Sequence, residues 1–124
     1  MTLIRCPYPH SDLSPNGRAN RHAKARKAKA YRHTCNVLAK EQGVHRMRWP
    51  EGTINVHLTI CPKPKGPLPD DDNAEASFKS GRDGIADAMG VDDKNFVVTR
   101  EIGARVKGGC ILVHIITEPK QVRS

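Results

Sequence analysis

The clearest pattern in the chain is a strict alternation of apolar and polar residues between Thr53 and Cys61. One side of this segment is entirely apolar and consists of Ile54, Val56, Leu58 and Ile60. A period of two residues predicts a β-strand that buries one face and leaves the other wet.

Three further segments have strand character. Residues 2–6 are interpreted as a short strand before a proline-rich stretch, and segments 96–102 and 110–117 are rich in β-branched residues. Glycines at 103, 108 and 109 separate the last two segments. This arrangement predicts a hairpin formed by the last two strands.

Two segments have helical character. Arg18–Gln42 is rich in Ala, Lys and Arg, lacks internal Gly and Pro, and ends at Gly43. Its apolar stripe is weak in the first half, and we expect it to comprise Ala23, Ala30, Thr34, Val37 and Leu38. In Asn73–Met89, apolar residues recur at helical spacing, and Gly81 and Gly84 predict close packing against another element.

The order strand, helix, strand, helix, strand, strand predicts an α+β fold. We expect two layers, with helices on one face of a mostly antiparallel or mixed sheet. A length of 124 residues fits a single domain. It divides into a basic N-terminal strand and helix (1–48), an acidic core (53–117) and a frayed tail (118–124).

Charge is distributed unevenly along this domain. Residues 18–48 hold ten cations and one acid, whereas residues 70–93 hold eight acids and two cations. With a net charge of +8, the excess of one sign on the first helix favours binding to phosphates of a nucleic acid, and a solvated charged helix is the structural alternative. The predicted DNA-binding residues are Arg18, Arg21, Lys24, Arg26, Lys27, Lys29 and Arg32.

Composition argues against several other classes of protein. No apolar run approaches the roughly 20 residues of a membrane span, and the N-terminus lacks the features of a secretory signal, so we expect an intracellular protein. The four cysteines lie far apart and are expected to be reduced thiols, buried or half-buried. His57 and His114 are interpreted as polar strand positions rather than metal ligands. Aromatic residues make up only 4%, which disfavours an RNA-binding module built on base stacking.

Two acidic groups bracket the second helix. Asp70, Asp71 and Asp72 precede it, and Asp92 and Asp93 follow it. An Asp before a helix also serves as an N-cap, which is the structural alternative. So many crowded carboxylates favour a bound Mg²⁺, which oxygen ligands suit. The two groups meet only if the strand after Asp93 runs back alongside the strand that precedes Asp70.

The ordered motifs resemble the RusA-type Holliday-junction resolvases of phages and prophages. That family carries D-x-D-N after a strand and loop, a helix with a Lys and an Asp-Gly/Ala-hydrophobic element, and then hydrophobic-Asp-Asp before a strand hairpin. This chain has P-D-D-D-N at 69–73, then Lys79, then D-G-I-A-D-A-M-G-V-D-D at 83–93. The resemblance covers roughly Thr53 to Thr117.

This resemblance implies an endonuclease that resolves four-way or branched DNA junctions by paired, symmetric phosphodiester hydrolysis. The implied cofactor is Mg²⁺, with Mn²⁺ as a substitute, and the implied assembly is a homodimer in the cytoplasm of a bacterial host cell. By position, the metal-binding and catalytic acids are Asp70, Asp72 and Asp93, with Asp92 as a competitor of Asp93. The catalytic lysine is Lys79, although it follows Asn73 by six residues where the better-known members have three.

A second function remains open from the residues alone. In a non-catalytic DNA-binding protein, the acids would cap the helix and the basic first helix would bind the phosphates. Cleavage in Mg²⁺ that EDTA abolishes separates the two functions.

Overall fold

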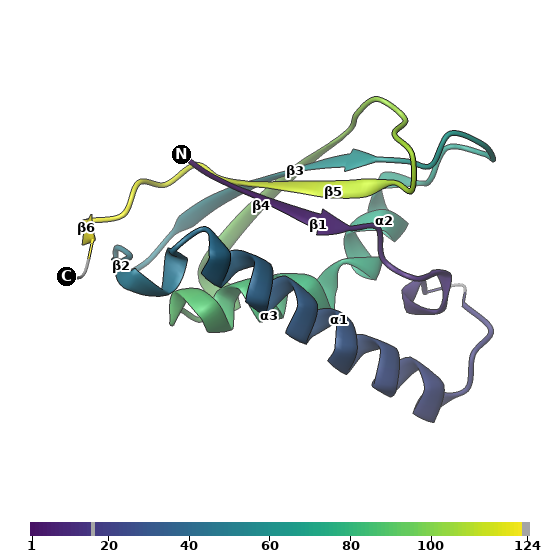
Figure 1. The fold of residues 1–124 in the computed structure, drawn as a ribbon, viewed down its shortest axis with the longest axis horizontal. Coiled ribbons are helices and arrows are strands. Elements are labelled where there is room, and N and C mark those ends of the chain that lie inside the picture. The colour runs from purple at the N-terminus through teal and green to yellow at the C-terminus, as the bar shows by residue number, and fades with distance from the viewer. Residues whose placement is uncertain (16, 123–124) are drawn as a thin grey trace.

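The computed structural model describes residues 1–15 and 17–122 and has two layers (Figure 1). One layer is a four-stranded sheet in the order β1 (Thr2–Pro7), β5 (Cys110–Ile115), β3 (Ile54–Cys61) and β4 (Phe96–Ile102). The other contains α1 (Arg21–Glu41), α2 (Asp71–Ser77) and α3 (Lys79–Met89). The predicted α+β fold, with helices on one face of a mixed sheet, is confirmed.

The pairing of the last two strands differs from the prediction. β4 and β5 do not form a hairpin, because β3 lies between them. β4 pairs parallel to β3, and β5 pairs antiparallel to both β3 and β1. Parallel neighbours need a long crossover connection, which α2 and α3 supply here. The glycines at 103, 108 and 109 lie in the loop that carries the chain past the end of β3 to β5.

Three short 3₁₀ helices complete the main body, namely η1 (Ser11–Leu13), η2 (Val44–Arg46) and η3 (Asp93–Asn95). Within the segment predicted to be a frayed tail, β6 (Gln121–Val122) pairs antiparallel with β2 (Met47–Arg48). Residues 123 and 124, the end of the predicted tail, lie outside the described part of the chain.

The core lies between the sheet and the helices, as the alternation in β3 predicts. The inward side chains of β3 are almost completely buried, and Phe78 and Ile85 cover them from the helical layer. The opposite face of the sheet carries the polar strand positions. There the rings of His57 and His114 lie with centroids 6.0 Å apart.

α1 begins and ends close to the predicted limits. The Asn20 side chain accepts a hydrogen bond of 2.8 Å from the Ala23 amide, and Gly43 adopts a left-handed conformation just after the helix. The predicted stripe is correct only in part: Leu38 packs against the core, whereas Ala30, Thr34 and Val37 are exposed. The fully buried residues of α1 are Tyr31, Cys35 and Ala39, and the Tyr31 hydroxyl donates to the Pro7 carbonyl.

Two glycines allow α3 to pack closely against α1, which confirms the expected role of Gly81 and Gly84. A Cβ atom on Gly84 would lie 2.1 Å from the main-chain oxygen of Arg32. One on Gly81 would lie 2.7 Å from the Tyr31 ring. The distance between these helices is therefore set by residues without side chains.

The predicted single helix over 73–89 is divided at Phe78. α2 ends at Ser77 and α3 begins at Lys79, and Figure 1 shows α2 leaving the direction of α3 toward the sheet. The Phe78 side chain is buried and packs edge-on against Tyr31, with ring centroids 6.0 Å apart. This break gives the acids of α2 and those of α3 different surroundings.

The cysteine prediction is confirmed, because Cys6, Cys35, Cys61 and Cys110 are all buried, free thiols. Within the described residues, none of the helices combines the length and apolar character needed to cross a membrane.

Candidate active site

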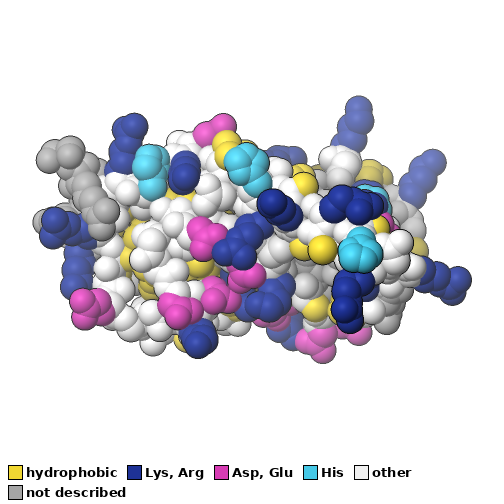
Figure 2. Space-filling view, turned by 90° about the horizontal axis from the view of Figure 1, so that it is seen from below, with side chains coloured by type: hydrophobic (Ala, Val, Ile, Leu, Met, Phe, Trp, Pro, Cys, Tyr) yellow, Lys and Arg dark blue, Asp and Glu magenta, His cyan; other side chains and the backbone are white. Residues whose placement is uncertain are grey.

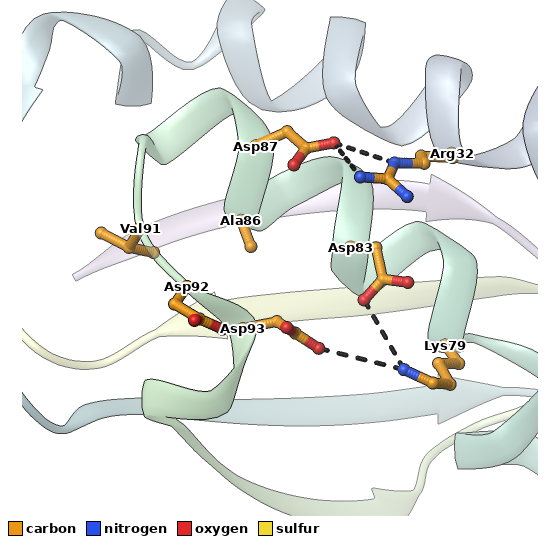
Figure 3. A pocket seen from close by; sticks show the side chains of 8 residues that line it. All are labelled: Arg32, Lys79, Asp83, Ala86, Asp87, Val91, Asp92 and Asp93. Carbon is orange, nitrogen blue, oxygen red and sulfur yellow. Dashed lines mark hydrogen bonds and ion pairs between the residues drawn. The ribbon is translucent and has the colours of Figure 1, made fainter.

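Two carboxylates face each other where η3 returns alongside α3. Asp83 lies in the middle of α3, and Asp93 is the first residue of η3. The chain reverses between them at Gly90, whose positive φ of 75° ends α3 in a left-handed cap. Lys79 lies between the two acids, with Nζ 3.8 Å from Asp83 Oδ1 and 3.9 Å from Asp93 Oδ2 (Figure 3).

The surroundings shift the pKa values of Asp83 and Asp93 in opposite directions. Burial and the hydrogen bond with Asp93 raise the pKa of Asp83. Burial also opposes ionisation of Asp93, but the hydrogen bond with Asp83 and the cations Lys79 and Arg82 outweigh it and lower the pKa of Asp93. Arg82 contributes through Nη2, 3.7 Å from Asp93 Oδ2. Titratable groups whose pKa values are driven apart in this way are typical of functional sites.

The pair opens into a surface hollow between α1, α3 and η3. Lys79, Asp83, Asp92 and Asp93 line one side of it, and Arg32 and Asp87 line the other (Figure 3). Arg32 donates two hydrogen bonds to Asp87 Oδ2, of 2.8 Å from Nε and 2.6 Å from Nη2. A residue of the basic helix therefore borders the acidic pair.

Asp92 has a structural role beside the pair. One of its carboxylate oxygens accepts a 3.0 Å hydrogen bond from the Lys94 amide and so caps η3. This contact holds the turn that presents Asp93 to α3. Asp93, rather than Asp92, is the acid that meets Asp83 and Lys79.

The acids of the D-D-D-N motif lie elsewhere. Asp70 is the N-cap of α2, where its side chain accepts a 3.0 Å hydrogen bond from the Asp72 amide. Asp72 pairs with Arg100 of β4, and the same guanidinium binds Glu75. The structural alternative, an N-cap, therefore describes Asp70.

The trio expected from the resemblance is not assembled in this structure. Among the side chains that the structure describes, which do not include that of Asp71, no three His, Cys, Asp or Glu side chains are placed to hold one metal ion. The parallel pairing of β4 is one reason, since Asp93 lies just before Phe96 whereas Asp72 contacts Arg100. Arg100 lies four positions after Phe96 along β4, which is about 13 Å at 3.3 Å per residue.

The break at Phe78 is the second reason. A straight helix would place Asp72, Lys79 and Asp83 near one line, because seven and eleven residues are close to whole turns. In the structure, Asp72 turns toward β4 while Lys79 and Asp83 turn toward η3.

The Asp83–Asp93 pair fits a divalent cation of the magnesium type. Mg²⁺ is usually held by one or two carboxylates, with water and substrate phosphate as its other ligands. Two facing carboxylates in an open hollow meet that requirement. The motifs quoted from the sequence include Asp83, as the first residue of the Asp-Gly/Ala-hydrophobic element, but only Asp93 and Lys79 of this site were predicted as site residues.

The cations of α1 form the basic part of the helical face. Figure 2 shows Lys and Arg side chains spread over this face, with acids between some of them. Lys27 pairs with Asp12 and Arg32 with Asp87. Within the described residues, no acidic side chain pairs with the other five cations predicted to bind DNA, namely Arg18, Arg21, Lys24, Arg26 and Lys29.

Comparison with known proteins gives one relative and no family. No protein-family model matches the chain. An uncharacterised protein of Xylella fastidiosa (strain Temecula1 / ATCC 700964) is 41% identical over 98 residues, which are 78% of this chain and 63% of that protein. This chain therefore spans less than two thirds of the relative's length.

Proposed function

We propose that this protein is a Mg²⁺-dependent, structure-selective endonuclease that cleaves four-way or branched DNA junctions. The observation that carries the proposal is the Asp83–Asp93 pair with Lys79 less than 4 Å from both carboxylates. The basic helix α1 borders the same hollow through Arg32. The resemblance to the RusA-type resolvases supplies the substrate class.

In this proposal Asp83 and Asp93 hold the metal ion, with Asp92 at the rim of the hollow. A bound Mg²⁺ supplies a water of lowered pKa and offsets negative charge on the phosphate. The Lys79 ammonium, whose side chain is 63% exposed, stabilises negative charge that develops on the phosphate oxygens. The α1 cations hold the DNA backbone without reading its sequence.

Asp93 and Lys79 belong both to this site and to the set that the resemblance implies. Asp70 and Asp72 remain predictions from the resemblance alone. A homodimer is part of the proposal, since symmetric nicks in a two-fold junction need two sites related by a two-fold axis. We place its action in the cytoplasm of a bacterial host cell, where such junctions form.

The non-catalytic DNA-binding protein is the second candidate. It is favoured by the structural roles of three of the acids: Asp70 caps α2, Asp92 caps η3, and Asp72 pairs with Arg100. In that case the acids stabilise turns, and α1 alone determines the function.

A cleavage assay decides between them. A labelled four-way junction and a linear duplex of the same sequence are incubated with the protein in Mg²⁺, and again in EDTA. We expect paired nicks in the junction only with Mg²⁺, their loss in Asp93→Asn, and their retention in Glu41→Gln, an exposed acid at the end of α1. Junction binding without cleavage in Mg²⁺ or Mn²⁺ would establish the second candidate instead.

A further inference from the structure

Two loops at one end of the sheet bring four exposed cations together. Residues 62–69 leave the end of β3, and residues 103–109 connect β4 to β5 (Figure 1). We define the loop surface as the cations that these loops carry. They are Lys63, Lys65, Arg105 and Lys107, and all four are exposed.

The two loops are joined by hydrogen bonds. Arg105 donates from its two terminal nitrogens to the main-chain oxygens of Lys63 and Gly66, both at 2.9 Å. The Val106 amide donates to the Pro62 carbonyl, also at 2.9 Å. Prolines at four positions further restrict the first loop. The cations are therefore presented by a braced backbone, so less conformational entropy is lost on binding.

The charge of the loop surface is not neutralised within the described part of the chain. No acidic side chain there pairs with any of its four cations. Arg105 uses one donor on each terminal nitrogen for the carbonyls, and a guanidinium has five N–H donors in total. Three donors remain for an anionic partner.

A hollow beside these cations adds a non-ionic surface. Tyr8 and Pro67 contribute to its lining, and Lys63 and Lys65 border it. The Tyr8 ring lies against Gly109, where a Cβ atom would approach it to 3.0 Å. An apolar floor edged by cations suits a sugar–phosphate chain, which presents deoxyribose between its phosphates.

We propose that the loop surface binds the sugar–phosphate backbone of a second DNA arm while α1 binds the first. The inference rests on the proposed function, because only a branched substrate presents two arms to one domain. Figure 1 shows the loops as an extension of the sheet layer and α1 in the helical layer, so the two basic surfaces are separate. Two linked surfaces raise the affinity for a junction above that for a single duplex.

The test compares two triple variants that remove the same charge. The first is Lys63→Gln with Lys65→Gln and Lys107→Gln. The control is Arg46→Gln with Arg48→Gln and Lys120→Gln, three exposed cations that lie beyond the C-terminal end of α1, near the β2–β6 pair. Binding of a four-way junction and of a short duplex is measured in EDTA by fluorescence anisotropy at several salt concentrations, with thermal melts to compare folding.

For the loop variant we expect a loss of junction affinity of about tenfold or more and a change of about twofold for the duplex. The slope of log affinity against log salt for the junction should fall by about 3, near 0.9 for each lost phosphate contact. The control should bind the junction within about threefold of the unchanged protein.

The outcomes separate this inference from the proposed function. Equal junction affinity in the two variants overturns the loop surface, while cleavage in Mg²⁺ by the unchanged protein leaves the proposed function standing. Selective loss of junction binding without any cleavage supports the loop surface and overturns the endonuclease. A protein that binds neither DNA overturns both.

Discussion

Two acidic clusters lie on the two halves of the divided helix, and they differ in how their charge is balanced. On α2, Asp72 and Glu75 share the guanidinium of Arg100. On α3, Asp83 faces another carboxylate, Asp93, and the nearest cations stay 3.7 to 3.9 Å away. In the first cluster a single guanidinium binds both carboxylates directly. In the second, the two carboxylates face each other and their two cations are held less closely, so a divalent cation would relieve their mutual repulsion.

This difference separates acids that support the fold from acids available for chemistry. A carboxylate held by an arginine has its charge satisfied within the chain and gains little from a metal. Two carboxylates in contact destabilise each other unless one is protonated or a cation binds. The α3 cluster, although it lacks two of the acids that the motif indicates, is therefore the better candidate for a metal.

The largest expected effect is the loss of cleavage on removing either carboxylate of the α3 pair. Asp93→Asn and Asp83→Asn should each lower the single-turnover rate on a four-way junction by about 10³-fold or more. Replacing a residue that only contacts a metal ligand already lowers metal affinity or activity by about 10 to 100-fold. Junction binding in EDTA should be retained, because the lost groups are anionic. A rate within threefold of the unchanged protein for Asp83→Asn would remove it from the site.

The next largest effect is expected at Lys79. Replacement by Ala should slow single-turnover cleavage by about 10²-fold, as for one lost electrostatic contact at the transition state. The matched control is Lys94→Ala, an exposed lysine that directly follows Asp93 but does not line the hollow. If Lys79 only pairs with Asp83 on the helix surface, the rate stays within threefold and the helix loses about 0.2 to 0.5 kcal/mol.

The packing of α3 against α1 holds the α3 cluster beside Arg32, and Gly84→Ala tests it. The added methyl would meet the Arg32 carbonyl at 2.1 Å, so the helices must separate. Overpacking typically costs 1 to 3 kcal/mol, and the gain in helix propensity returns about 1 kcal/mol. We expect a net loss of up to about 2 kcal/mol in the free energy of unfolding, measured by urea denaturation. Equal stability of the variant would mean that the helices separate at little cost.

The pattern of the sequence contains much of the fold but only part of the site. The alternation in β3 and the helical spacing around Phe78 predict the buried faces, because burial follows the periodicity of each element. The placement of β4 beside β3 was not predictable, since β-branched segments joined by glycines favour a hairpin equally well. Because β4 runs parallel to β3, Asp93 lies at the end of the sheet where β3 begins, whereas Asp70 follows the end of β3.

The split of the helix was also hidden from the sequence. Phe78 continues the apolar stripe whether or not the helix bends there, so periodicity does not distinguish the two cases. Motif spacing therefore grouped Asp72 with Lys79, although their partners lie on different elements. The three extra residues between Asn73 and Lys79, relative to the family pattern, were the only sign of a local change.

A smaller effect is expected on stability, where Asp83→Asn should stabilise the metal-free protein rather than weaken it. The raised pKa of Asp83 means that the folded state binds its proton more tightly than the unfolded state. This contribution to stability is present at acid pH and is lost as the pH rises through the folded-state pKa. In EDTA at neutral pH, Asp83→Asn should therefore melt at a higher temperature than the unchanged protein. The gain should vanish in acid, and a lower melting temperature at both pH values would contradict it.

The smallest effect is expected at Asp72. The proposed metal site at Asp83 and Asp93 does not include this acid, whereas the family motif does. Because Asp72 pairs with Arg100 and is 74% exposed, Asp72→Asn should reduce the free energy of unfolding by about 1 kcal/mol or less. Its cleavage rate should stay within threefold of the unchanged protein. Thermal melts and single-turnover cleavage, run beside Asp83→Asn, measure both quantities. Loss of cleavage in Asp72→Asn, with activity retained in Asp83→Asn, would return the metal site to the acids that the family motif indicates, and α2 would then have to approach Asp93 when DNA and Mg²⁺ bind.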